Sequence, residues 1–153
     1  MSPPRLLDTS IVSLYIAPRA AEKTPKLLDT VDAVIATDGA RISIVTYYEL
    51  DRGLRKLELR NEGRTKRRYF TMFVSGTTLL GLDASSFRGW DIAAGLHARA
   101  ATLTPAIVFE DADLLILATA LAYDLRLLTA DRNLANRAAD LGIADGVELV
   151  EVS

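Results

Sequence analysis

The chain has 153 residues, of which 50% are hydrophobic and 25% are charged, and its formal net charge is −2. This size and composition fit one globular domain over residues 1–153, and the absence of cysteine excludes a disulfide framework or a thiolate zinc site. The small net charge excludes a uniformly basic surface, so any surface that binds nucleic acid must be local.

The first half of the chain alternates strand-like and helix-like patterns. Residues 5–8 form a short apolar run, and Thr9 or Ser10 can cap the helix that follows. Thr24-Pro25 opens a second helix, which ends near residue 39. Residues 42–45 are rich in β-branched side chains and predict a strand. The segment Thr46-Tyr47-Tyr48-Glu49 then matches a capping box, which predicts a helical hairpin over residues 46–75.

The second half continues this alternation. Ser85 or Ser86 is expected to cap a long helix that ends near Leu103, before Pro105. The remaining elements are predicted as a strand over 77–82, a buried helix over 114–122, a strand over 126–129, a helix over 133–141 and an edge strand over 147–152. Strands separated by helices indicate an α/β fold, in which helices flank both faces of a mainly parallel sheet of four or five strands (α/β/α).

Four acidic residues lie where an apolar run passes into a helix start: Asp8, Glu49, Asp113 and Asp131. Acids at the carboxyl ends of parallel strands meet on the edge of the sheet where open α/β folds bind ligands. Clustered carboxylates repel one another unless a cation neutralises them, and hard oxygen ligands suit Mg²⁺ or Mn²⁺. The positions therefore predict one metal site.

Each acid also has a purely structural interpretation. Asp8 and Asp131 can cap helices, and Glu49 can reach back to a backbone amide as the last residue of the capping box. Asp111 and Asp113 are favourable near the positive end of a helix dipole. Neutral Ser, Thr or Asn would cap equally well, so the presence of acids at all four transitions favours the cluster.

Several other kinds of site are absent from the sequence. There is no GxGxxG motif, and the spacing of Gly76 and Gly81 lacks the lysine and hydroxyl residue of a phosphate-binding loop. His97 is the only histidine, which excludes a two-histidine metalloprotease motif. No apolar run approaches the roughly 18–20 residues of a membrane span. With no secretory signal pattern either, we expect a cytoplasmic protein without membrane association.

Four blocks of sequence together resemble the PIN-domain ribonucleases, and the compact length is most similar to the VapC toxins of VapBC toxin–antitoxin pairs. The resemblance extends over essentially the whole chain, with the blocks in the same order and spacing. They are Leu6-Leu7-Asp8-Thr9-Ser10, Ile44-Val45-Thr46-Tyr47-Tyr48-Glu49-Leu50 with Gly53, Asp113-Leu114-Leu115-Ile116-Leu117-Ala118-Thr119-Ala120, and Leu128-Thr129-Ala130-Asp131.

The resemblance implies a metal-dependent nuclease site at the four acids. Asp8 and Asp113 would be direct ligands of one or two Mg²⁺ or Mn²⁺ ions, while Glu49 and Asp131 would bind directly or through water. Asp111 is an alternative or assisting residue for Asp113. Three hydroxyl residues can orient waters or carboxylates, or act as ordinary caps: Thr9, Ser10 and Thr129.

A short region after Glu49 carries eight of the 18 basic residues. This basic segment can contact RNA phosphates, with Tyr47, Tyr48 and Tyr69 as stacking surfaces, or it can be a solvated helical face. The resemblance further implies a homodimer and a VapB-like antitoxin, for which Phe70, Phe73 and Val74 can form an interface instead of core. The basic segment consists of Arg52, Arg55, Lys56, Arg60, Arg64, Lys66, Arg67 and Arg68.

The leading hypothesis is therefore a metal-dependent endoribonuclease that acts as a toxin. The alternative is a catalytically silent PIN-like module in which the acids are only helix caps and the basic segment binds RNA or a protein.

Overall fold

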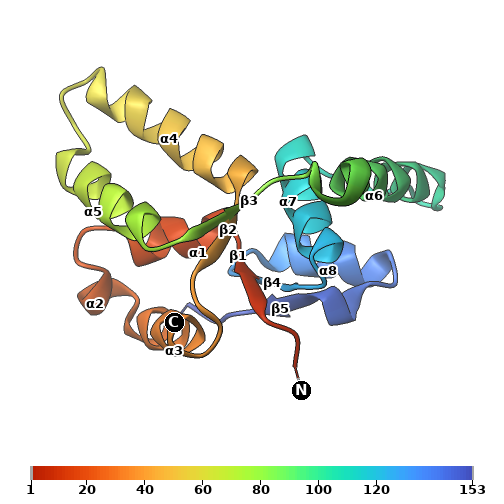
Figure 1. The fold of residues 1–153 in the computed structure, drawn as a ribbon, viewed down its shortest axis with the longest axis horizontal. Coiled ribbons are helices and arrows are strands. Elements are labelled where there is room, and N and C mark those ends of the chain that lie inside the picture. The colour runs from red at the N-terminus through yellow and green to blue at the C-terminus, as the bar shows by residue number, and fades with distance from the viewer. Residues whose placement is uncertain (1, 153) are drawn as a thin grey trace.

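The computed structural model describes residues 2–152, so the two ends of the predicted domain lie outside the described residues. Figure 1 shows the elements in chain order. They are β1 (Arg5–Leu7), α1 (Thr9–Tyr15), α2 (Ala20–Lys23), α3 (Pro25–Asp38), β2 (Arg41–Ser43), α4 (Ile44–Glu58), α5 (Arg64–Ser75), β3 (Thr78–Leu80), α6 (Ala84–Thr102), α7 (Asp111–Ala122), β4 (Arg126–Thr129), α8 (Arg132–Asp140), η1 (Ala144–Gly146) and β5 (Val147–Leu149).

All paired strands are parallel, which confirms the predicted α/β fold. One sheet has the order β1-β4-β5, and a second sheet pairs β2 with β3. Strand β1 lies beside β2, so the strands follow the order β3-β2-β1-β4-β5 in Figure 1. Strand β5 is at the edge, as its alternating sequence predicts, although it ends at Leu149.

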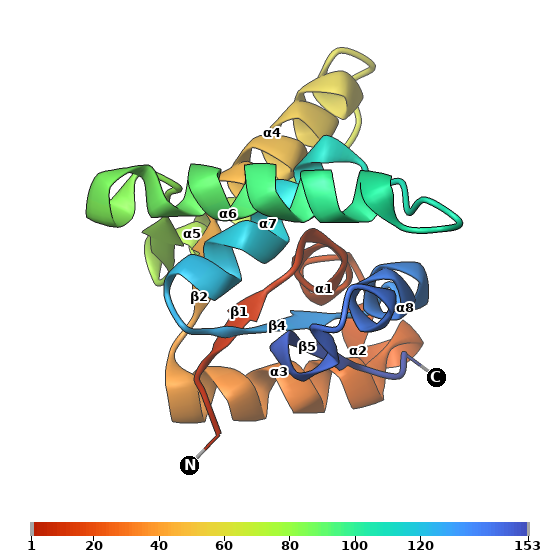
Figure 2. The same ribbon diagram turned by 90° about the vertical axis from the view of Figure 1, so that its right-hand side faces the viewer.

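Helices cover both faces of the strands. Figure 1 shows α1 to α5 on one side and α6 to α8 on the other, and Figure 2 shows α6 crossing over α7. Successive strand residues point to opposite faces, so Leu6 and Leu127 pack in the core beneath α6, α7 and α8. Leu7 and Leu128 pack with α1, α3, α4 and α5. Burial on both faces explains why these strands are apolar without alternation.

The N-cap of α4 lies three residues earlier than the capping-box pattern predicts, at Ser43 instead of Thr46. The Ser43 side chain accepts a hydrogen bond from the Val45 amide and caps the helix, which starts at Ile44. Thr46 is therefore inside the helix, and Glu49 lies in its second turn. The capping interpretation of Glu49 is wrong, because the serine that ends β2 already caps α4.

The start of α6 also differs from the expected serine cap. Ser85, Ser86 and Phe87 have positive φ angles, between 51° and 69°, so they form a left-handed turn before the regular helix. Trp90 Nε1 donates a hydrogen bond to Asp83 Oδ1 across this turn, at 2.6 Å.

No helix within residues 2–152 is long and apolar enough to cross a membrane.

Two glycines of α6 predict opposite effects of alanine. A Cβ at Gly89 would lie 2.8 Å from the Leu82 backbone, whereas a Cβ at Gly95 would meet nothing within 4 Å. We expect Gly95→Ala to raise the free energy of unfolding by about 0.5–1 kcal/mol, because alanine forms helix better. Gly89→Ala should lower it by about 1–3 kcal/mol through overpacking. Urea denaturation measures both, and equal effects would contradict the predicted close packing at Gly89.

Candidate active site

Asp8 directly follows β1 and is 3% exposed. Its amide donates a hydrogen bond to the Leu128 carbonyl at 2.9 Å, which continues the pairing of β1 with β4. Its side chain makes no capping bond to α1. The structural interpretation of Asp8 as a cap therefore does not account for its carboxylate.

Two hydroxyls fix one oxygen of Asp8. Ser10 Oγ and Thr129 Oγ1 donate to Asp8 Oδ2 at 2.8 and 2.6 Å. Ser10 also accepts from the Ala130 amide at 3.0 Å, and Thr129 accepts from the Asp131 amide at 3.0 Å. The network joins the carboxyl ends of β1 and β4, so it holds Asp8 and the start of α8 in a fixed relation.

The second oxygen of Asp8 has no hydrogen-bond partner within residues 2–152, although it is fully buried. Burial raises the pKa of Asp8, the hydroxyls of Thr129 and Ser10 and the nearby Thr9 amide lower it, and the charge of Asp131 adds a smaller increase. A buried and unpaired carboxylate oxygen costs free energy unless a ligand satisfies it. This oxygen is the clearest single position for a cation.

Glu49 approaches the site from α4. Thr9 Oγ1 donates to Glu49 Oε1 at 2.7 Å and lies 3.0 Å from the Thr46 hydroxyl. The other oxygen, Glu49 Oε2, lies 3.6 Å from Arg52 Nη2. These contacts connect the first turn of α1 to α4 and direct the carboxylate away from the helix backbone.

Asp113 lies in the first turn of α7 and is half-buried. Its pKa is raised to about 6, first by burial and then by the negative charges of Asp8, Asp131, Glu110 and Glu49. All four acids expected from the sequence therefore interact electrostatically at one place. Glu110 is a further acid of this region that the sequence analysis did not single out.

Asp111 occupies the same helical turn but is exposed. Residues two positions apart project from different sides of a helix. Asp111 accordingly is not among the acids that raise the pKa of Asp113. The geometry favours Asp113 as the member of the cluster.

Asp131 performs the capping role that the sequence allowed. Its Oδ1 accepts from the Asn133 and Leu134 amides at 2.9 and 3.2 Å, which caps α8. Its charge also raises the pKa values of Asp8 and Asp113. Capping occupies only Oδ1, so Asp131 Oδ2 is left for another ligand.

The donor chemistry of this cluster fits a hard divalent cation. Carboxylate and hydroxyl oxygens are the ligands that Mg²⁺ and Mn²⁺ prefer. Within residues 2–152, no three Asp, Glu, His or Cys side chains already surround a common point closely enough to hold an ion. Asp8 is fixed by its hydroxyl partners, so binding would require side-chain rotation of the outer acids toward it.

A buried hydroxyl pair also supports the site and was not identified from the sequence. Ser43 Oγ lies 3.1 Å from Thr119 Oγ1, and Thr119 donates to the Leu115 carbonyl at 2.8 Å. The pair joins the start of α4, which carries Glu49, to α7, which carries Asp113. Its only sequence signal is a hydroxyl residue at each position within apolar surroundings.

A family model of the PIN domain matches residues 5–140, which include all four acids. The chain belongs to the PIN domain family. A comparison with curated proteins found no significant sequence match.

Solved structures share this PIN fold over nearly the whole chain. A chain of VapBC2 from Rickettsia felis, in a structure bound to promoter DNA, has a TM-score of 0.74 at 15% identity, covering 97% of this chain and 98% of that chain. For FitAcB from Neisseria gonorrhoeae the TM-score is 0.65 at 23% identity, with 88% and 93% covered. For VapBC-5 from Mycobacterium tuberculosis it is 0.62 at 21% identity, with 98% and 100% covered. The neighbours therefore show the fold.

Some cations of the basic segment form ion pairs with carboxylates and others do not. Arg55 and Arg67 contact Asp51 at 2.7 and 2.8 Å, and Arg67 also contacts Glu58 at 2.6 Å. These two arginines are neutralised within α4 and α5. The segment is therefore not a uniform phosphate-binding stripe.

Only one of the three tyrosines lies exposed beside the acids. Tyr48 is 59% exposed, and the Arg52 guanidinium lies over its ring, 5.2 Å from the centroid. Tyr47 instead packs on Phe70 with ring centroids 5.4 Å apart. Tyr69 lies on α5 and lines a pocket that contains none of the four acids.

The raised pKa of Asp113 predicts how stability depends on pH. The folded state disfavours the carboxylate form of Asp113. The free energy of unfolding therefore falls as the pH rises from 3.8, the ordinary pKa of the group, through about 6, its pKa in the folded protein. Asp113→Asn should therefore raise the melting temperature at pH 7.5 in metal-free buffer, and this gain should disappear near pH 4. Asp111→Asn is the control without a gain. A pH-independent effect of Asp113→Asn would contradict the electrostatic cluster.

Proposed function

We propose that the protein is a divalent-metal-dependent endoribonuclease, the VapC-type toxin of a toxin–antitoxin pair. The observation that carries this proposal is the buried Asp8 carboxylate, which has a free oxygen and whose charge, together with those of Asp131 and Glu49, raises the pKa of Asp113. Membership of the PIN family and the fold shared with chains of VapBC complexes support it.

Asp8 and Asp113 would hold a Mg²⁺ or Mn²⁺ ion, with Glu49 and Asp131 as outer ligands. A bound ion would neutralise charge on the phosphodiester and lower the pKa of an attacking water. Ser10 and Thr129 fix the orientation of Asp8, and Thr9 does the same for Glu49. Asp8 is therefore fixed in place, whereas Glu49 would exchange its contact with Thr9 for the ion by side-chain rotation.

The RNA substrate would approach over α4, next to the acids. Tyr48 offers the ring face that Arg52 leaves open for stacking an unpaired base, and Arg52, whose contact with Glu49 is 3.6 Å long, adds a partly neutralised positive charge. Arg55 and Arg67 contribute less because their own acids neutralise them. Single-stranded RNA is the substrate form that this surface favours.

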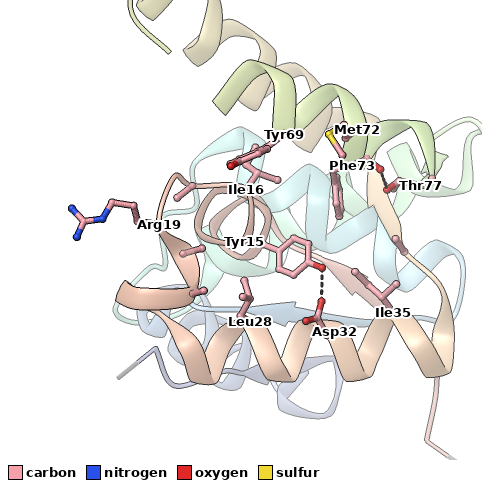
Figure 3. Close-up of a pocket in the computed structure, with 15 residues that line it drawn as sticks. Tyr15, Ile16, Arg19, Leu28, Asp32, Ile35, Tyr69, Met72, Phe73 and Thr77 are labelled. Atoms are coloured by element: carbon pink, nitrogen blue, oxygen red, sulfur yellow. Dashed lines mark hydrogen bonds between the residues drawn. The ribbon is translucent and has the colours of Figure 1, made fainter. Parts of the chain in front are cut away.

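The PIN domain has an apolar groove that suits an antitoxin-like partner. A cavity of about 680 Å³ lies between α1, α3 and α5, with Met72 and Phe73 above it and Ile35 below it (Figure 3). Tyr15 donates a hydrogen bond to Asp32 inside it. Met72 is 65% exposed beside the apolar lining of this groove, so it offers a hydrophobic contact to a partner. Phe70 is core, at 2% exposure, whereas Phe73 packs on the core and also lines the groove.

We further propose a homodimer. The segment from β3 into α6 carries large apolar side chains that are exposed: Leu79, Phe87 and Trp90. Strand β3 is also an edge strand, which leaves backbone groups available for another copy. Sedimentation equilibrium of the wild type and of Phe87→Glu tests whether this surface mediates association.

Asp8→Asn tests the metal site directly. The amide keeps an oxygen for Ser10 and Thr129, so the fold should persist, but the anionic ligand is lost. We expect RNA cleavage to fall more than about a hundredfold. Mn²⁺ should raise the melting temperature of the wild type but not of the variant. Asp111→Asn is the matched control and should retain cleavage.

Two results would contradict the nuclease proposal. One is unchanged cleavage by Asp8→Asn. The other is a wild-type protein that neither cleaves RNA nor is stabilised by divalent ions, which would favour the silent binding module instead.

Met72→Asp tests the partner groove. The variant should still cleave RNA, because none of the four acids lines the groove, but it should escape inhibition by the antitoxin of the proposed pair. Leu59→Asp is the control, since Leu59 is 87% exposed and lies outside the groove. Growth arrest during co-expression reports the outcome. Full inhibition of Met72→Asp would contradict docking in this groove.

A further inference from the structure

A second cavity opens directly beside the candidate active site. It has a volume of about 410 Å³ and lies between α1, α4 and α5. Thr9 and Glu49 of the acid cluster form part of its wall, and Ser13, Arg52 and Lys66 form the rest of its polar lining. The cavity is therefore continuous with the site and lies outside the partner groove of Figure 3.

Lys66 is the unusual cation of this cavity. Its ammonium donates to Ser13 Oγ at 3.1 Å, and no carboxylate within residues 2–152 forms an ion pair with it. The neighbouring Arg67, by contrast, contacts two acids. Partial burial lowers the pKa of Lys66. A partly buried cation without an anion is costly, so an anionic ligand would stabilise it.

Gly53 provides an independent observation. It lies in the interior of α4 and lines the same cavity. A Cβ there would meet nothing within 4 Å, and its φ is not positive. Glycine is among the weakest helix formers, and neither packing nor backbone conformation requires it here. What the glycine does provide is open space beside Glu49.

The remaining lining is apolar. Leu50, Leu54 and Leu57 of α4 form a hydrophobic floor beneath the polar groups. A volume of this size falls within the usual range of about 300–1,000 Å³ for ligand pockets. A positive charge above an apolar floor suits a nucleotide, which carries a phosphate next to a ring with apolar faces.

We propose that this cavity binds one unpaired nucleotide of the RNA, next to the phosphate that is cleaved. The nucleotide's own phosphate lies at Lys66, and its base lies over the leucine floor at Gly53. This inference rests on the proposed function, because Glu49, the one acid of the cluster that also lines the cavity, places the cavity next to the phosphate that is cleaved. Thr9 and Arg52 contact the two oxygens of Glu49, and Glu49 forms no ion pair with Lys66.

A binding experiment tests the charge. The probe is a short single-stranded RNA labelled with fluorescein, and all proteins carry Asp8→Asn so that cleavage does not interfere. Lys66→Gln should weaken binding about fivefold and reduce the slope of log affinity against log salt by about 0.7, the value for one phosphate contact. Lys26→Gln, which removes an exposed cation of α3, is the control and should change neither.

A second pair of variants tests the space. Gly53→Leu should place a side chain in the cavity and weaken RNA binding about tenfold by steric exclusion. Gly95→Leu makes the same change at another helix position with open surroundings and should leave RNA binding unchanged. Thermal melting should show that neither variant is less stable than its parent, since leucine favours helix.

The outcomes separate this inference from the proposed function. Wild-type RNA affinity in both Lys66→Gln and Gly53→Leu would overturn the nucleotide pocket, even if the wild-type protein cleaves RNA. Loss of partner binding with unchanged RNA affinity would also overturn it and assign the cavity to a protein. Weaker RNA binding by both variants would support the pocket, even if the wild-type protein fails to hydrolyse RNA.

Discussion

The parallel pairing of β1 with β4 is the constraint on which the site depends. It aligns Leu7 with Leu128, so the residues after both strands leave the sheet at the same edge. The hydroxyls of Ser10 and Thr129 then connect the two chain segments through one oxygen of Asp8. Asp8 and Asp131 lie 123 positions apart in the sequence, and it is this register that brings them into one electrostatic environment.

The cluster opposes the stability of the domain that carries it. Burial disfavours the charge of Asp8, and Asp113 is half-buried among other acids, which raises its pKa. Three helix starts partly offset this cost, because Asp8, Asp113 and Asp131 lie near the positive ends of α1, α7 and α8. Residual repulsion of this kind is typical of functional sites rather than of structural ion pairs.

Packing of α4 against α5 determines which cations of the basic segment are neutralised by carboxylates. Asp51 and Glu58 neutralise arginines on the outer side of the helical hairpin. Lys66 faces inward without a carboxylate in the described chain, in a cavity that Gly53 leaves open. The hairpin thus combines arginines that its own acids neutralise with a lysine in the cavity beside Glu49, and the groove of Figure 3 is lined by α5 together with α1 and α3.

The sequence by itself determined the alternation of strands and helices and the four acids at their junctions, because periodicity, caps and strand ends are local properties. It did not determine the start of α4, where the Ser43 cap prevails over the capping-box pattern. It favoured Asp113 over Asp111 only through the resemblance to PIN domains, and it could not separate Lys66 from Arg67 or Tyr48 from Tyr47. The members of each pair are close in sequence, so local patterns do not distinguish them. Tertiary packing places Asp113 among the acids, pairs Arg67 with carboxylates and packs Tyr47 against Phe70.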